Sequence, residues 1–279
     1  MNASLGRVAH AARAAGLGGA LRLVRNGVDS TLLRARRPVL RARYEGLEVR
    51  GFLRHRSFLA GIDRGDYEPT LRNLILESAG PGTLFVDAGA HVGFYSLLAD
   101  RAGANVVALE PDPYNLAALR RNLRGTRAEV LGAAVSDSVG AASFHLSSST
   151  TGSSLVDRGD IEMTKSVPVE TTTVDAIVAG RVFETLVLKV DVEGAEPAVL
   201  AGAQHALRDA TRATVIAEVH PNALAANRAS PDDVIAPLRA AGYDIRFVDQ
   251  EGNVGDVPGT PTKGNVVATR GLSHPARAS

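Results

Sequence analysis

The sequence predicts an α/β protein built around a largely parallel sheet. From Thr83 onward, short apolar segments alternate with amphipathic segments of helical spacing, and this alternation is typical of βαβ units. Polar residues directly follow several of the apolar segments, at the edge where open parallel sheets bind ligands. Because 45% of the 279 residues are apolar, the chain can bury a core, and disorder of the whole chain is excluded.

Seven apolar segments are the expected strands, and four amphipathic segments are the expected helices between them. The strands cover residues 84–87, 105–110, 128–131, 186–191, 213–219, 243–248 and 265–269. The helices cover residues 92–101, 113–123, 195–209 and 231–241. Between the third and fourth strands, two β-type segments, 142–146 and 167–174, flank the hydroxyl-rich segment 147–154. This insert predicts a hairpin that carries a polar loop.

The N-terminal 43 residues differ from the rest in charge. They hold nine Arg and one acidic residue, Asp29, and so carry +8, whereas the other 236 residues carry −7 and the whole chain +1. Apolar residues at helical spacing, from Leu5 to Ala15, predict a basic helical appendage. Residues 44–52 alternate as a strand or hairpin does, and residues 67–79 are expected to be helical.

The expected organisation therefore has three parts. Residues 1–65 form a basic appendage with a short strand region, residues 66–270 form the main domain, and residues 271–279 are expected to be a disordered tail.

The composition excludes several classes of protein. The chain has no Cys, which excludes disulfides, thiolate metal sites and cysteine nucleophiles. With 4% aromatic residues, no Trp and an acidic main body, the domain lacks the features of a nucleic-acid binder. No apolar run approaches the ~18 residues of a membrane-spanning helix, so a cytoplasmic location is expected. Two interpretations of residues 1–43 stay open: peripheral contact with the anionic inner face of a membrane, and a helical appendage that packs on the domain or frays in solvent.

The turn after the first strand predicts a nucleotide site. Val86-Asp87-Ala88-Gly89-Ala90-His91-Val92-Gly93 leads into a helix that opens Phe94-Tyr95-Ser96. Glycines at such a turn let the backbone approach a ligand closely. The G-x-G-x-x-G pattern of dinucleotide-binding proteins is absent, and the carboxylate of Asp87 at the strand tip disfavours a pyrophosphate there. It favours instead a ligand that carries ammonium and sulfonium groups.

The next two strand ends add polar groups that suit such a ligand. Glu110 ends the second strand, about where an acidic residue accepts hydrogen bonds from a ribose diol, and Ser136 or Asp137 after the third strand can bond an adenine amino group. S-Adenosylmethionine fits this pattern better than NAD does. The alternatives are that Glu110 only neighbours a helix N-cap and that Ser136 and Asp137 only form a turn. The expected cofactor-binding residues are Asp87, Gly89, His91, Gly93, Tyr95, Ser96, Glu110, Ser136 and Asp137.

The fourth and fifth strands end in the candidate catalytic residues. Lys189, Asp191 and Glu193 alternate along an extended segment, so their side chains are expected on one side. His220 follows the fifth strand on the same sheet edge and is the first choice as the base that takes a hydroxyl proton, with Asp191 the second. Capping of the following helix is the alternative for Glu193 and Glu196. Asp191, Glu193 and His220 offer too few committed ligands to predict a metal, so no metal site is assigned and the question stays open.

These segments resemble the FkbM-type methyltransferases. The pattern of that family is a V-D-x-G-A-N-x-G-x-Y-S turn, an E-P strand end and a K-I-D-V-E-G-x-E strand end, which match residues 86–96, 110–111 and 189–196 here. The likeness covers roughly residues 66–270. One departure is His91, which stands where the family usually has Asn. His91 can still donate a hydrogen bond, so we expect cofactor binding to survive.

The resemblance implies a class I methyltransferase fold of Rossmann type, with a seven-stranded sheet whose last strand, 265–269, is antiparallel. It also implies S-adenosylmethionine as methyl donor and O-methylation of a sugar, glycolipid or secondary metabolite, so the expected partner is a small-molecule or glycolipid acceptor. Two other functions stay open: an NAD-dependent dehydrogenase or epimerase, and a non-catalytic scaffold that keeps the cofactor fold.

Overall fold

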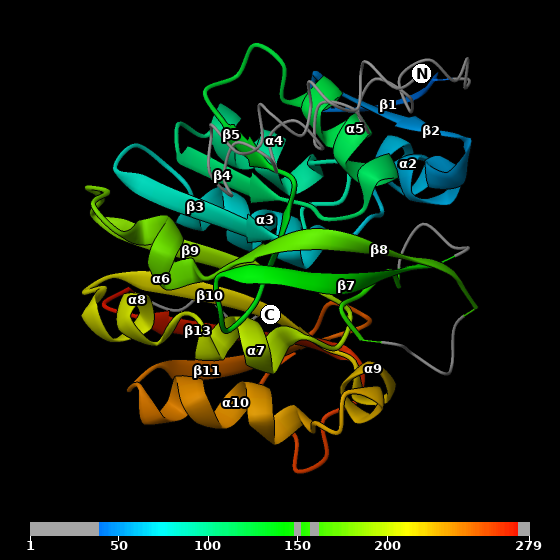
Figure 1. Cartoon of the computed structure of the whole chain (residues 1–279). Coiled ribbons are helices and arrows are strands. Elements are labelled where there is room, and N and C mark those ends of the chain that lie inside the picture. The colour runs from blue at the N-terminus through cyan, green and yellow to red at the C-terminus, as the bar shows by residue number, and fades with distance from the viewer. Residues whose placement is uncertain (1–38, 148–151, 157–161, 273–279) are drawn as a thin grey trace, which may run out of the picture. The chain divides into compact units, whose positions relative to one another are not determined.

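The computed structural model describes residues 39–147, 152–156 and 162–272 (Figure 1). The predicted basic helix, the centre of the hydroxyl-rich loop and most of the predicted tail lie outside the described residues. The described residues, from Val39 to Leu272, group as one compact unit. No helix in the described part of the chain is both long and apolar enough to cross a membrane.

An eight-stranded mixed sheet forms the centre of this unit. Its strand order is β12-β11-β13-β10-β9-β3-β4-β5. The bounds are β3 (Thr83–Ala88), β4 (Asn105–Leu109), β5 (Glu129–Leu131), β9 (Thr185–Val190), β10 (Ala213–Val219), β11 (Asp244–Asp249), β12 (Val254–Gly255) and β13 (Gly264–Arg270). All seven predicted strands are present, and β13 pairs antiparallel with both β10 and β11, as the resemblance implied. The strand count of seven is one too low, because the two-residue edge strand β12 joins β11.

Helices cover both faces of the sheet and enclose two apolar clusters. One cluster holds side chains of α3 (Pro69–Ser78), α4 (Phe94–Arg101) and α5 (Pro113–Asn122). The other holds side chains of α6 (Val174–Val178), α7 (Glu196–Ala201), α8 (Gln204–Asp209), α9 (Pro221–Ala226) and α10 (Pro231–Ala240). Successive residues of one strand enter opposite clusters, as Val187 and Leu188 do. Burial on both faces explains why these strands are continuous apolar runs.

The single helix predicted over residues 195–209 is wrong, because α7 and α8 are separate. A Cβ on Gly202 would lie 2.1 Å from the carbonyl oxygen of Ser136, so the chain passes another backbone segment at this point. The carboxylate of Asp175 then accepts hydrogen bonds from the N–H groups of His205 and Ala206, at 3.1 and 2.7 Å. These bonds cap a new helix start.

An antiparallel hairpin and one helix precede α3 and pack on the first cluster. The hairpin consists of β1 (Val39–Tyr44) and β2 (Leu47–Phe52), and α2 (Arg56–Arg64) follows it. Asn122 of α5 exchanges two hydrogen bonds with the backbone of Arg50, both 2.8 Å long. The N-terminal hairpin is therefore part of the same packed unit as the sheet.

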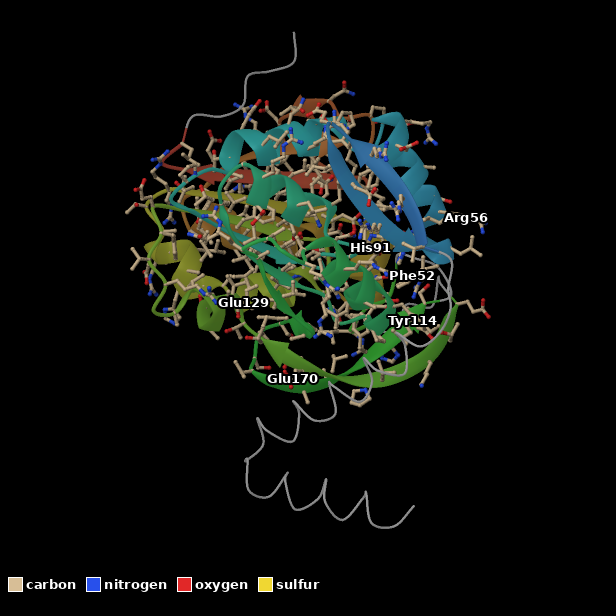
Figure 2. All side chains as sticks on the ribbon, turned by 90° about the horizontal axis from the view of Figure 1, so that it is seen from above. Phe52, Arg56, His91, Tyr114, Glu129 and Glu170 are labelled. Atoms are coloured by element: carbon tan, nitrogen blue, oxygen red, sulfur yellow. The ribbon has the colours of Figure 1, made fainter. Side chains whose placement is uncertain are left out.

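The predicted insert forms a hairpin within a second, three-stranded sheet. Its order is β6-β8-β7, with β6 (Ala133–Val135), β7 (Gly140–Ser147) and β8 (Met163–Thr172). Seen from above, Glu170 of β8 lies at the outer edge of the molecule and His91 lies further in (Figure 2). We call residues 152–156 the strap. Ser154 of the strap exchanges backbone hydrogen bonds of 2.8 and 3.0 Å with His145, which brings the strap back along β7.

Candidate active site

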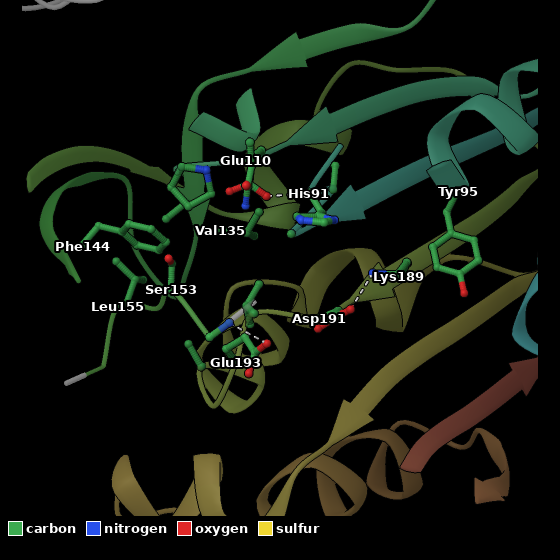
Figure 3. Close-up of a pocket in the computed structure, with 18 of the residues that line it drawn as sticks. His91, Tyr95, Glu110, Val135, Phe144, Ser153, Leu155, Lys189, Asp191 and Glu193 are labelled. Atoms are coloured by element: carbon green, nitrogen blue, oxygen red, sulfur yellow. Dashed lines mark hydrogen bonds and ion pairs between the residues drawn. The ribbon is translucent and has the colours of Figure 1, made fainter. Parts of the chain in front are cut away.

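A pocket lies at the carboxyl ends of β3, β4 and β9, and the strap and β7 close one side of it (Figure 3). Six of the predicted site residues line it: Gly89, His91, Tyr95, Glu110, Asp191 and Glu193. The other predicted site residues are absent from its lining: Asp87, Gly93, Ser96, Ser136, Asp137 and His220. The lining also includes residues that the sequence did not indicate, above all Phe58, Tyr67, Asn115, Phe144 and Leu155.

The turn between β3 and α4 needs its glycines. Gly89 has a φ of +82°, and a Cβ there would lie 1.9 Å from the carbonyl oxygen of Asp191, so no side chain fits. Gly93 has a φ of +87°, and its Cβ would lie 2.5 Å from a methyl group of Leu119. The N–H groups of Gly89 and Ala90 both donate to the carbonyl of Leu109, at 3.0 and 2.9 Å. The turn is therefore held between the ends of β4 and β9.

Glu110 is buried at the edge of the pocket, with 5% of its surface exposed. Its two carboxylate oxygens accept hydrogen bonds from the N–H groups of His91 and Asp112, both at 2.8 Å. Burial and, second, repulsion from Asp112 raise the pKa of Glu110 to about 8, although these hydrogen bonds act in the opposite direction. A fixed carboxyl group in this place is suited to the hydroxyl groups of a ribose.

One end of the pocket is an apolar slot formed by Pro111, Val135, Phe144 and Leu155. Phe144 comes from β7 and Leu155 from the strap, and Figure 3 shows both on the side away from Tyr95 and Lys189. An apolar slot suits an adenine ring. Sequence reasoning missed these two residues because the register that brings the hairpin to this edge is not readable from local patterns.

Ser136 and Asp137 follow β6 but do not reach the slot. Asp137 is exposed, and its carboxylate accepts a hydrogen bond of 3.0 Å from the hydroxyl of Ser138. The preceding residues, Ala134 and Val135, line the pocket instead. Ser136 and Asp137 thus lie outside the pocket lining, and their contact with an adenine amino group stays a prediction.

Lys189 is the centre of a buried charge network beside the pocket. Its ammonium lies 3.1 Å from the Oδ2 of Asp191 and 3.8 Å from the Oδ1 of Asp87. Asp87 also accepts a 2.6 Å hydrogen bond from the hydroxyl of Ser96. Burial alone lowers the pKa of Lys189, but Asp191, Asp87 and Glu68 together raise it above its ordinary value, so the ammonium stays charged. Asp87 and Ser96 thus support the site through Lys189.

Tyr95 closes this end of the pocket. Its ring lies 5.4 Å from the ammonium of Lys189, and its hydroxyl donates a 2.5 Å hydrogen bond to Glu68. Burial, together with the neighbouring Glu68, raises the pKa of Tyr95 well above its ordinary value. The phenol therefore stays protonated and acts as a hydrogen-bond donor.

The turn after β9 is shaped by Glu196. The carboxylate of this buried residue accepts hydrogen bonds from the N–H groups of Val192 and Gly194, each at 3.0 Å. Its pKa is raised to about 7 by burial, against the lowering effect of the backbone hydrogen bonds. Glu196 therefore has a structural role, while Glu193 accepts a 2.9 Å hydrogen bond from the N–H of Gly152 in the strap.

Asp191, Glu193 and Glu218 bring three carboxylates together, with one oxygen of each within 4.8 Å of the others. The register explains this contact: Ala217 of β10 pairs with Val190 of β9, so Glu218 and Asp191 lie side by side at the carboxyl ends of parallel strands. No metal ligand is assigned among them, because acidic clusters form without an ion as well.

His220 lies two residues beyond Glu218 and caps a helix. It is the N-cap of α9, and its Nδ1 accepts a hydrogen bond of 3.4 Å from the N–H of Ala223. The residue that the structure places next to Asp191 on β10 is Glu218.

The pocket fits S-adenosylmethionine in its donor set. The apolar slot suits adenine, Glu110 suits the ribose, and the carboxylates near Lys189 suit a cationic sulfonium and ammonium end. A pyrophosphate would face Asp191 and Glu193, and the ammonium of Lys189 is already paired with Asp87 and Asp191, which disfavours NAD.

Comparison with known proteins agrees with this fit. The family model described as the methyltransferase FkbM domain matches residues 87–245, more than half of the chain. No curated protein matches the sequence significantly.

The solved structures to which the chain is similar include three methyltransferases. The tRNA (uracil-54, C5)-methyltransferase of Pyrococcus abyssi, in complex with S-adenosyl-L-homocysteine, has 13% identity and a TM-score of 0.43, over 83% of this chain and 44% of that chain. This chain thus spans less than half of that enzyme's length. A TehB-like SAM-dependent methyltransferase of Corynebacterium glutamicum has 13% identity and a TM-score of 0.44, over 77% of this chain and 93% of that chain. The magnesium protoporphyrin IX methyltransferase of Synechocystis, with bound SAM, has 13% identity and a TM-score of 0.41, over 78% of this chain and 84% of that chain.

The assignment rests on the family match, which covers the turn after β3, Glu110 and the end of β9. The chain belongs to the FkbM methyltransferase family and is an S-adenosylmethionine-dependent methyltransferase.

Proposed function

We propose that this methyltransferase methylates a hydroxyl group of a sugar, a glycolipid or a secondary metabolite. The observation that carries the proposal is the pair of carboxylates, Asp191 and Glu193, in the lining of the pocket. Carboxylates accept hydrogen bonds from hydroxyl groups and take up their protons. The resemblance of the strand ends to FkbM-type enzymes supports the same class of acceptor.

Each residue of the site has a role in this proposal. The bound cofactor supplies an electrophilic methyl group on a sulfonium sulfur. Glu110 holds the ribose diol, and the turn at Gly89 and His91 lets the backbone lie close to it. Asp191, fixed by its ion pair with Lys189, orients the acceptor hydroxyl. Holding two reactants in the right geometry is itself a large part of catalysis.

The remaining predicted residues act indirectly. Asp87 and Ser96 hold Lys189, Gly93 allows α4 to pack on α5, and Tyr95 covers the ammonium of Lys189. His220 is absent from the lining of this pocket and caps α9, so its role as base stays a prediction, whereas Asp191 and Glu193 lie in the lining itself.

The test has two stages. Calorimetry with S-adenosylhomocysteine and with NAD separates a methyltransferase from a dehydrogenase, and we expect binding of the first only. Radiolabelled S-adenosylmethionine is then incubated with polar and lipid extracts of cells that lack the gene. We expect a labelled product that survives alkaline hydrolysis, as a methyl ether does. Label that alkali releases indicates a carboxylate acceptor and contradicts the proposal, as does label held on nitrogen.

A further inference from the structure

A second cavity, of about 670 Å³, lies beside the cofactor pocket. Its walls come from α2, the start of α3, the end of β10, and the segment that joins β11 to β13. Phe58 and Tyr67 belong to the linings of both cavities. Their rings are in edge contact, with centroids 4.7 Å apart. The volume is in the range of about 300–1,000 Å³ that is typical of small-molecule sites.

The two cavities also approach each other at a pair of carboxylates. Asp191 lines the cofactor pocket and Glu218 lines the second cavity. These neighbours stand at the ends of β9 and β10 with oxygens within 4.8 Å, so the two cavities come close to each other at this pair.

The second cavity has an excess of negative charge. Its described lining contains two basic side chains, Arg64 and Lys263, and five acidic ones, Asp66, Glu68, Glu218, Asp249 and Glu251. Both basic groups are already paired, Arg64 with Asp66 at 2.6 Å and Lys263 with Glu218 at 3.3 Å. A phosphate or carboxylate on a ligand would therefore be repelled, whereas a neutral or ammonium-bearing ligand would not.

Glu218 has a buried carboxylate oxygen that no hydrogen bond within the described residues uses. Asp191 is paired with Lys189 and Glu193 accepts the N–H of Gly152. The Oε2 of Glu218 is buried and accepts no hydrogen bond from the described residues. A buried acceptor without a partner is costly, and a hydroxyl group entering from the second cavity would satisfy it.

We propose that the second cavity binds the methyl acceptor, that this acceptor is an uncharged or amine-bearing polyol, and that Glu218 takes the proton of the reacting hydroxyl. The inference rests on the proposed O-methylation. The O–H bond breaks and its proton passes to Glu218, the oxygen bonds to the methyl carbon, and the electron pair of the broken S–C bond stays on sulfur. The site loses one negative charge as the sulfonium loses its positive charge.

The surroundings of Glu218 support its role as a base. Burial and, after it, the charges of Asp191 and Glu193 raise the pKa of Glu218, although Lys263 acts in the opposite direction.

Binding of charge-matched probes tests the class of acceptor. The protein, saturated with S-adenosylhomocysteine, is titrated by ligand-observed NMR with the methyl glycosides of glucose, glucosamine and glucuronic acid. We expect the glucosamine and glucose derivatives to bind and the glucuronic acid derivative to bind at least about tenfold more weakly, a difference of about 1.4 kcal/mol. If the glucuronic acid derivative binds as tightly as the other two, the inference is overturned. It is also overturned if none of the three binds at a probe concentration of about 20 mM, which is on the order of the weakest useful dissociation constant.

Blocking the cavity tests its location. The chain has no cysteine, so Asn265→Cys provides a single thiol in the wall of the second cavity, in register with Glu218 across β10 and β13. Labelling with a bulky maleimide is expected to abolish probe binding and leave the affinity for S-adenosylhomocysteine within about threefold. The control is the same label on Glu129→Cys, at the edge strand β5, which is expected to change neither. Unchanged probe binding after labelling at residue 265 overturns the location.

Glu218→Gln tests the proton acceptor with the extract that shows methyl transfer. We expect turnover to fall about 100-fold or more, as for loss of a general base, and the rate to lose its rise with pH, while S-adenosylhomocysteine still binds. Turnover close to the wild-type rate overturns the role of Glu218. If no methyl ether forms with the wild-type protein, the proposed function fails. If a methyl ether forms, and at the same rate with the labelled Asn265→Cys protein and with Glu218→Gln, only this inference fails.

Discussion

At the scale of single residues, backbone conformation explains the departure at His91. Its φ is +53°, a left-handed conformation that Asn adopts readily and His tolerates. The contact that fixes Glu110 uses the backbone N–H of His91 and not the side chain. The ring instead packs against Phe58 and His55, with centroids 4.7 and 5.1 Å away. Replacement of the family's Asn by His therefore leaves the hold on Glu110 intact.

The raised pKa of Glu110 makes the stability of the protein depend on pH. Between its ordinary pKa of 4.5 and the folded value of about 8, the folded chain keeps a proton that the unfolded chain has lost. The free energy of unfolding therefore falls as pH rises through this window. For Glu110→Gln, which cannot ionise, we expect this fall to be smaller by on the order of 1–4 kcal/mol between pH 5 and 8.5.

Urea denaturation at a series of pH values measures this effect. Glu129→Gln, on the exposed end of β5, is the matched control and is expected to follow the wild-type curve. If the curves of Glu110→Gln and the wild-type protein stay parallel across the window, the burial of an ionisable Glu110 does not influence stability.

At the scale of elements, the strap is the part of the insert that completes the cofactor pocket. Ser153 donates a 3.1 Å hydrogen bond to Asp112, the N-cap of α5. Ser154 donates a 2.9 Å hydrogen bond to the carbonyl of Glu193. These bonds join the strap to the ends of both β4 and β9, and they place Leu155 in the apolar slot.

Truncation of Leu155 is expected to weaken cofactor binding without unfolding the protein. Leu155→Ala removes apolar surface that would cover the adenine, worth about 1–2 kcal/mol, and so should raise the dissociation constant of S-adenosylhomocysteine about 5- to 30-fold. Val156→Ala, one residue further along the strap and outside the pocket lining, should leave it unchanged. Calorimetry measures the dissociation constant of S-adenosylhomocysteine for each variant. Equal values for Leu155→Ala and Val156→Ala would show that adenine does not bind in the apolar slot.

The elements that the sequence predicts well are those whose signal is local. The strands at the centre of the sheet are buried on both faces, so continuous apolar runs such as 106–109 are strong signals. The break between α7 and α8 depends on Gly202 meeting Ser136, and the pairing of Glu218 with Asp191 depends on the register of β9 and β10. Contacts of this kind join segments far apart in the chain, so local patterns pointed to the ends of β9 and β10 but not to the contact between Glu218 and Asp191.

At the scale of the whole molecule, the compact unit begins earlier than the change in composition suggests. The +8 segment ends at Arg43, yet β1 already starts at Val39, and Ala42 within it is 1% exposed. Arg41 and Arg43 therefore belong to a packed strand, and Arg43 donates its backbone N–H to Asp63 of α2 at 2.9 Å. Charge alone does not separate the appendage from the folded unit.

This boundary decides how the basic segment is tested. A chain that starts at Val39 keeps β1, and we expect it to bind S-adenosylhomocysteine as the full chain does. A chain that starts at Tyr44 loses the strand paired with β2 and the burial of Ala42, and its melting temperature should fall by several degrees.

We expect the full chain, but not the Val39 chain, to co-sediment with vesicles rich in anionic lipid, because residues 1–38 hold seven Arg and one acidic residue. Equal sedimentation of the two chains would show that the basic segment makes no membrane contact, whereas a Val39 chain that fails to bind S-adenosylhomocysteine would mean that residues 1–38 contribute to the folded unit.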